Sequence, residues 1–150
     1  MQIIPLTGPE AVFRRATHKI VLTFADFLAR TSGTAFTIYP GLLSTTNLPK
    51  GFVVRNVYSD VVTAAVSSGG AITSLSLSIG DTASATKYVN ATDCKVADTF
   101  TAYQTGFAHT NATDNIKAVA TIVGQTLASL TALEVHLWLD MIDLNTGENP

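Results

Sequence analysis

An alternation of apolar and hydroxyl side chains in residues 72–79 constrains the fold of this chain more than any other feature. The alternating residues are Leu75, Leu77 and Ile79 on one side and Ser74, Ser76 and Ser78 on the other. A period of two is that of a β-strand with one buried face and one face in water. Glycines before the segment, and Gly80-Asp81 after it, are typical of turns. The segment therefore predicts a central strand and shows no chemistry of its own.

Comparable patterns recur along the chain, with turn residues about every ten residues. Strands are expected at 17–24, 35–39, 52–66, 72–79, from 87–89 onward, 99–103, 115–123 and 133–142. Residues 25–30 favour a short turn, and Gly106 is expected to break the strand pattern. Many short strands without a long helix predict an all-β fold, a single β-sandwich or jelly-roll-like domain. We place this domain at residues 17–145, after an extended N-terminal arm at 1–16 and before a polar tail at 146–150.

The turn Ser67–Gly70 suggests one long-range contact. It separates the Val-rich segment 52–66 from the strand 72–79, and its two glycines tolerate the positive φ of a tight hairpin. We expect these two strands to pair as a β-hairpin.

The chain carries unusually little charge. Charged residues make up 13% of it and hydrophobic residues 47%, whereas about 25% charged residues is typical. Two interpretations stay open, a neutral β domain and a subunit whose flanks lie against neighbours. The net charge of −2 gives no field that would attract nucleic acid or an acidic membrane surface. No apolar run is long enough for a membrane span, and the first residues lack a signal-peptide pattern, so we expect synthesis in a cytoplasm.

Four residues are candidates for contacts with other subunits. Pro9 favours a short helical turn through Phe13, and Arg14 and Arg15 give the arm the densest positive charge of the chain. The arm is either a loosely docked terminus or a tether on an acidic neighbour. Trp138 lies on the polar face of the last strand. It is either covered by its own chain, or an anchor at a subunit contact, or exposed for stacking on a sugar.

No arrangement of residues predicts catalysis, a cofactor or a metal site. Cys94 has no histidine near it in sequence, and we expect a small buried residue that forms no disulfide. The histidines at 18, 109 and 136 lack the spacing of zinc ligands. No nucleophile elbow, no evident pair of carboxylates and no glycine-rich phosphate loop is present. We therefore expect a non-enzymatic protein.

Several segments together resemble small virion structural proteins of tailed bacteriophages, of the head decoration (cement) or auxiliary capsid type. They are Leu48-Pro49-Lys50-Gly51-Phe52-Val53-Val54, the strand that runs to Ser67-Ser68-Gly69-Gly70, the segment from Ile72 to Thr82, and Leu127-Ala128-Ser129-Leu130-Thr131. The resemblance covers about residues 17–144 and not the arm. It implies that many copies of the chain lie symmetrically on a capsid. Its partners are then the major capsid protein and other copies of itself, which usually form trimers. It also implies a place in the virion and no enzymatic activity.

A second function stays open beside capsid decoration. A β-sandwich also serves as a receptor- or glycan-binding module of a phage fibre or tail, because binding then depends on loops and not on the fold. Copy number separates the two functions, since a shell protein is present in numbers that match the symmetry of the capsid.

Overall fold

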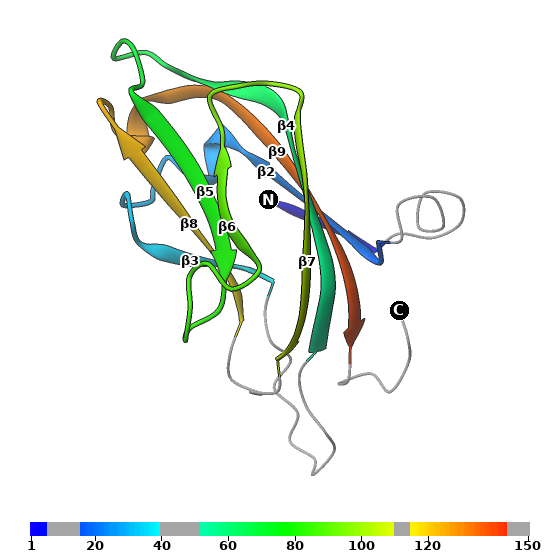
Figure 1. Cartoon of the computed structure of the whole chain (residues 1–150). Coiled ribbons are helices and arrows are strands. Elements are labelled where there is room, and N and C mark those ends of the chain that lie inside the picture. The colour runs from blue at the N-terminus through cyan, green and yellow to red at the C-terminus, as the bar shows by residue number, and fades with distance from the viewer. Residues whose placement is uncertain (6–15, 40–51, 110–114, 144–150) are drawn as a thin grey trace.

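The chain folds into two antiparallel β-sheets that pack face to face (Figure 1). The computed structural model describes residues 1–5, 16–39, 52–109 and 115–143. One sheet has five strands in the order β1-β2-β9-β4-β7, and the other has four in the order β3-β8-β5-β6. The strands are β1 Gln2–Pro5, β2 His18–Thr23, β3 Ala35–Tyr39, β4 Phe52–Ser67, β5 Ser74–Gly80, β6 Val89–Asp93, β7 Thr99–His109, β8 Ile116–Val123 and β9 Leu130–Asp143. The predicted all-β sandwich is confirmed.

Two short 3-10 turns complete the described elements. The first, η1 (Phe24–Asp26), begins where the Asp26 carboxylate accepts a hydrogen bond from the backbone N–H of Thr23 at 2.9 Å. It overlaps the short turn expected at residues 25–30 and begins one residue earlier, at Phe24. The second, η2 (Leu127–Ser129), leads from β8 into β9. Among the described residues, no helix has the length and apolar character needed to cross a bilayer.

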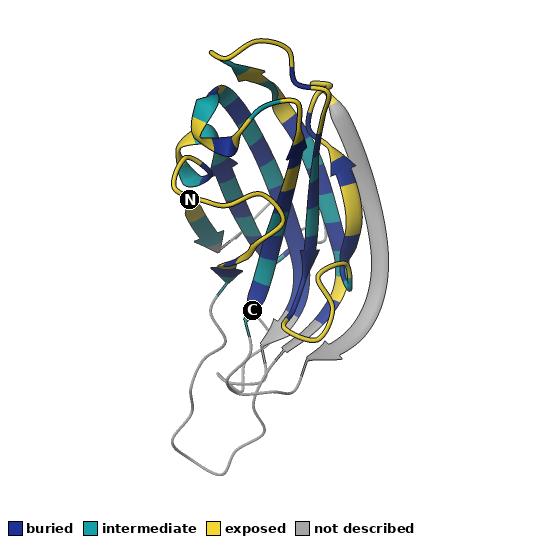
Figure 2. Cartoon of the chain, turned by 90° about the vertical axis from the view of Figure 1, so that its left-hand side faces the viewer, coloured by how far each residue is buried: buried dark blue, intermediate teal, exposed yellow. Residues whose placement is uncertain are grey.

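The core lies between the sheets and is formed by the apolar faces that the alternation predicted. Leu75, Leu77 and Ile79 of β5 are at most 1% exposed. In β9 the inward residues Leu133, Val135, Leu137, Leu139 and Met141 are at most 3% exposed. Figure 2 shows the result as bands of buried and more exposed residues that alternate along the strands. Burial of these faces is the main favourable contribution to folding.

The predicted hairpin between 52–66 and 72–79 is wrong. β4 pairs with β7 and β9 in the five-stranded sheet, whereas β5 pairs with β6 and β8 in the other sheet. β4 ends at Ser67 and β5 begins at Ser74. The residues between them carry the chain across the roughly 10 Å that separate packed sheets. The positive φ of 118° at Gly70 serves this crossing. A turn signal fixes where a chain changes direction, but it does not fix the partner of the next strand.

The strand expected at 99–103 is longer than predicted. β7 extends to His109 and passes through Gly106, which we expected to break it. Its register against β4 shifts here, since Val54 pairs with Phe107 but Asn56 pairs with Gln104. Glycine inside a strand often marks such a bulge. The long ladder with β4 therefore carries the strand past a residue that is locally unfavourable.

The first residues of the expected arm belong to a sheet. β1 pairs antiparallel with β2 as the edge strand of the five-stranded sheet, with Ile3 opposite Ile20 and Ile4 opposite Lys19. Residues 6–15, with the helical turn expected there, and the polar tail 146–150 lie outside the described residues. Ala16, the last residue of the expected arm, is 2% exposed and packs against Trp138.

Candidate interaction surfaces

Trp138 lies near the centre of the outer face of the five-stranded sheet, where its own chain covers it. β9 has β2 on one side and β4 on the other, so Lys19 and Tyr58 are its register neighbours. The side chain is 3% exposed and packs with Ala16, Ile4 and Tyr58. A tryptophan covered by its own chain was one of the alternatives that the sequence left open. An indole so deeply buried offers no face for stacking on a sugar.

Charged and aromatic groups surround this tryptophan. The Lys19 ammonium lies 5.3 Å from the centroid of the Trp138 ring, a cation–π distance. The His136 ring meets the indole edge-on, with 5.5 Å between the centroids. His136 Nε2 also lies 2.7 Å from an oxygen of Glu134. These contacts fix the outer face of β9 as a packed polar and aromatic layer.

The interface residues expected on the arm are not described by the structure. Phe13, Arg14 and Arg15 fall within residues 6–15, so their contact with neighbours stays a prediction. Trp138 is described, and its role at a subunit contact also stays a prediction. The structure brings it together with Ile4 and Ala16 from the N-terminal region. This proximity was not readable from the sequence, because it depends on the pairing of β1 with β2.

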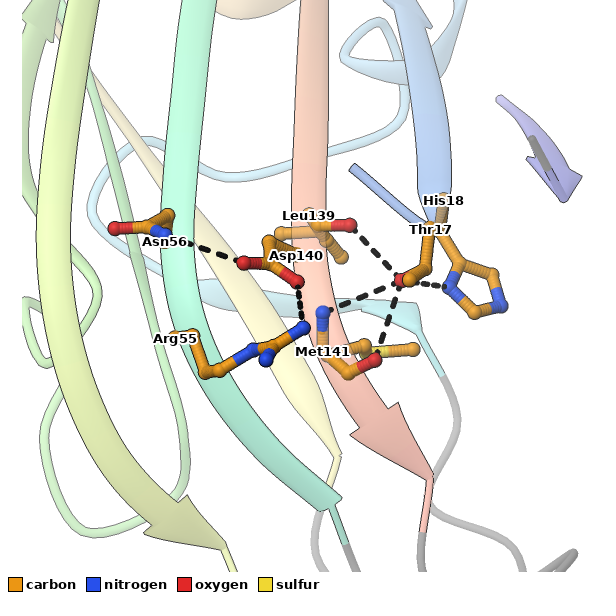
Figure 3. A network of polar contacts seen from close by, with 7 residues as sticks. All are labelled: Thr17, His18, Arg55, Asn56, Leu139, Asp140 and Met141. Atoms are coloured by element: carbon orange, nitrogen blue, oxygen red, sulfur yellow. Dashed lines mark hydrogen bonds and ion pairs between the residues drawn. The ribbon is translucent and has the colours of Figure 1, made fainter. Parts of the chain in front are cut away.

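A second polar cluster lies where β4 begins and β9 ends (Figure 3). The Asp140 carboxylate, in a residue 6% exposed, accepts hydrogen bonds from Arg55 at 2.6 Å and from the Asn56 amide at 3.2 Å. The register of β4 against β9 shifts between Val54 and Asn56, so Arg55 is the extra residue of a bulge. Sequence analysis missed this cluster, because the bulge that positions Arg55 arises only when the strands pair.

The start of β2 is tied to the same strand. The Thr17 hydroxyl donates to the carbonyl oxygen of Leu139 at 3.0 Å and accepts from the backbone N–H of Met141 at 3.2 Å. The Thr17 oxygen also lies 2.9 Å from Nδ1 of His18. These bonds clamp two adjacent strands. The carboxylate of the neighbouring Asp140 is bound by Arg55 and Asn56 of β4, so these polar groups join β9 to the strands on both of its sides.

Cys94 is not a nucleophile in this fold. It is 1% exposed, and burial, followed by the nearby Asp93 carboxylate, raises the pKa of its thiol to about 12. Its Sγ lies 3.6 Å from the carbonyl oxygen of Thr92. A thiol with such a pKa carries almost no thiolate at neutral pH. The expectation of a small buried cysteine is confirmed.

Neither of two hollows among the described residues holds a set of catalytic groups. One, of about 220 Å³, lies over β9 and is lined by Thr23, Phe24, Thr63, Thr131, Ala132, Leu133 and Glu134. The other, of about 320 Å³, is lined by Arg30, Thr31, Ser32, Ile122, Gln125, Thr126, Leu127 and Ala128. Neither lining contains a cysteine, a histidine or a pair of carboxylates. Across the described residues, no group of three or more His, Cys, Asp or Glu side chains is placed to hold a metal ion.

The turn after β5 is organised by Asp81. Its carboxylate accepts hydrogen bonds from the backbone N–H groups of Ala83 and Ser84, both at 2.9 Å, and pairs with the Lys87 ammonium at 2.6 Å. Burial by itself would raise the pKa of Asp81. The hydrogen bonds from Lys87 and from the backbone outweigh burial, so the pKa lies below its usual value.

The lowered pKa of Asp81 predicts a loss of stability in acid. A carboxyl group with a depressed folded-state pKa contributes stability above its unfolded-state pKa, about 3.9, and this contribution is lost as the pH falls through the folded-state pKa. We expect Asp81→Asn to lower the free energy of unfolding at pH 7 by about 1–3 kcal/mol. As the pH falls below about 4, the free energy of unfolding should decrease less steeply in the variant than in the unchanged protein. Urea unfolding measured as a function of pH checks both expectations.

Asp98→Asn is the matched control for this experiment. Asp98 is exposed and has a positive φ of 57°, a conformation that asparagine tolerates well. We expect Asp98→Asn to change the free energy of unfolding at pH 7 by no more than about 0.5 kcal/mol. Equal acid profiles for Asp81→Asn and the unchanged protein would contradict the assigned role of Asp81.

Comparisons with known proteins give one structural likeness. The fold is similar to a chain of the cyanophage Pam1 capsid asymmetric unit, with a TM-score of 0.50 and 18% sequence identity. The alignment covers 82% of this chain and 79% of that one. No protein-family model matches the sequence, and no curated protein matches it. At this identity the likeness concerns the fold.

Proposed function

We propose that this chain is a non-enzymatic structural protein of a phage virion, one that decorates or cements the capsid through contacts between symmetric copies. The observation that carries the proposal is the likeness of most of the chain to a chain of a phage capsid asymmetric unit. The resemblance of its sequence segments to phage decoration proteins points in the same direction. Its partners are then the major capsid protein and other copies of itself, with a trimer as the expected arrangement.

The outer face of the four-stranded sheet supports this role. Its outward residues in the two central strands are mainly neutral: Ser74, Ser76, Ser78, Val119, Thr121 and Val123. In this part of the chain Lys117 is the charged exception, and its ammonium contacts the Thr82 hydroxyl at 2.8 Å. A face with few charged groups avoids the large cost of desolvating charges when a neighbour covers it, and its hydroxyl groups can form hydrogen bonds with that neighbour. Many modest contacts of this kind add up on a symmetric shell.

The packing of the described residues also supports a passive role. The thiol of Cys94 is buried, the carboxylate of Asp140 is used by Arg55 and Asn56, and that of Asp81 by Lys87 and the backbone. Such a domain provides preformed surfaces. This is what a cementing subunit requires, since ordering on binding would weaken each contact.

The proposal is tested by counting copies in the virion that contains the protein. We expect quantitative mass spectrometry of purified particles to find this chain in a fixed small-integer ratio to the major capsid protein. A reconstruction of the particle should show matching density on the outside of the shell. A handful of copies confined to the tail would contradict decoration and favour the fibre or tail module. Absence from purified particles would contradict both functions.

A further inference from the structure

The contacts that hold β1 in the five-stranded sheet could equally be made by the β1 of another copy of this chain. In the described part of the chain its backbone pairs with β2 alone. Ile3 packs against the core between the sheets, and Ile4 packs against the cluster of Ala16 and Trp138. The amino group of Met1 pairs with the Asp26 carboxylate. A β1 from another copy of this chain could therefore make the same contacts.

β1 covers part of Trp138 and pairs with the backbone of β2. Without β1, Trp138 would lose the cover of Ile4, and the four residues of β2 that pair with it would lose their partners. β1 is nevertheless a weakly held strand. It has four residues, Met1 and Gln2 are exposed, and Ile3 and Ile4 are half-buried. Short edge strands with little buried surface open at a low free-energy cost.

The connection to β2 is longer than a hairpin requires. Pro5 and His18 are register partners, so the link between the paired strands consists of residues 6 to 17. Two residues are enough to join adjacent antiparallel strands. The twelve residues of this link span at most about 43 Å when extended, at about 3.3–3.6 Å per residue, whereas a strand as long as β2 measures about 20 Å. A link of this length does not by itself confine β1 to β2 of its own chain.

We propose that copies of this chain exchange β1, so that the β1 of one copy completes the five-stranded sheet of the next, and that this exchange closes a ring of copies. Exchange of an identical element keeps every contact of β1 and costs little beyond the association itself. The high effective concentration within a ring favours it further. This inference rests on the proposed function in one respect, that copies meet in a symmetric arrangement.

A disulfide between β1 and β2 tests the exchange in the purified full-length protein. Gln2 and Val21 are register partners; Gln2 is exposed and Val21 half-buried, so Gln2→Cys with Val21→Cys disturbs little of the core. Native Cys94 is 1% exposed and does not compete. After mild oxidation and denaturation, we expect a non-reducing gel to show covalently linked chains, up to a closed trimer. Linked monomers alone would overturn the proposal, and so would two thiols that stay free.

Co-expression of two single-cysteine chains gives an independent measurement. One tagged chain carries Gln2→Cys and a differently tagged chain carries Val21→Cys. A disulfide between the two tags requires exchange, because neither chain can form this bond alone. The control pair is Gln2→Cys with Thr121→Cys, since Thr121 is exposed on the other sheet, and we expect no linked product from it.

The two proposals fail in different ways. Linked monomers together with the expected copy number in virions would end the exchange and leave capsid decoration standing. Covalent trimers from a protein that is absent from the capsid would do the reverse.

Discussion

Leu77→Ala is expected to lower the free energy of unfolding by about 2–5 kcal/mol. Leu77 is 1% exposed in the middle of β5, and its register partners are the small residues Ala120 and Thr92. Neighbours of this size cannot move in to fill the space left by the removed methyl groups. The cost therefore includes the lost transfer free energy and the cavity. Chemical denaturation measures this loss in the free energy of unfolding. We expect the slope of the free energy against denaturant concentration to stay unchanged.

Ser76→Ala is the control on the same strand. Ser76 is half-buried on the outer face of β5, and its side chain points away from the core. We expect a change within about 0.5 kcal/mol, as for most surface substitutions. Equal losses for the two variants would mean that the alternation in residues 72–79 does not separate a core face from an outer face.

Gly80→Ala is expected to cost about 3 kcal/mol, at the upper end of the effects of overpacking. A Cβ at position 80 would lie 1.9 Å from the carbonyl oxygen of Ser84 and 2.5 Å from the carbonyl carbon of Ala85. Both are backbone atoms, so no side-chain rotation relieves the clash. The turn cannot retreat easily either, because the Asp81 carboxylate binds the N–H of Ser84 at 2.9 Å. Denaturant unfolding measures the loss, and hydrogen exchange at Ser84 should become faster.

Gly33→Ala separates this steric effect from backbone strain. Gly33 has a positive φ of 77°, and nothing lies within 4 Å of a Cβ built there. Its replacement should cost only the strain of a side chain in the left-handed region, about 1–2 kcal/mol. A smaller loss at Gly80 than at Gly33 would contradict the tight approach of the turn to β5.

Local patterns gave the strands and their buried faces. The alternation in β5 and β9 identified core residues correctly, because side chains in an extended chain must point to opposite faces whatever the topology. The same patterns located most other strands and the turn that contains η1. The burial of Cys94 also followed, since a small apolar side chain without reactive neighbours is usually interior.

The pairing of the strands could not be read in this way. The pattern of β4 and β5 predicted a hairpin, yet each strand has two other partners. The length of β7 was underestimated, because the ladder with β4 outweighs the local effect of Gly106. The bulge that brings Arg55 to Asp140 likewise exists only between paired strands. Such contacts depend on residues far apart in sequence, whose signals are not local.

The sequence by itself determined that this protein is a charge-poor β-sandwich without a recognisable catalytic motif. Periodicity and composition are local properties, so they can be read from the sequence without knowing which strands pair. Only the tertiary structure decided that Gln2–Pro5 forms the edge strand of a sheet, and that Ile4 and Ala16 cover Trp138. These outcomes were decided by which strands lie side by side, and that choice minimises the exposed apolar surface and unpaired backbone groups of the whole chain at once.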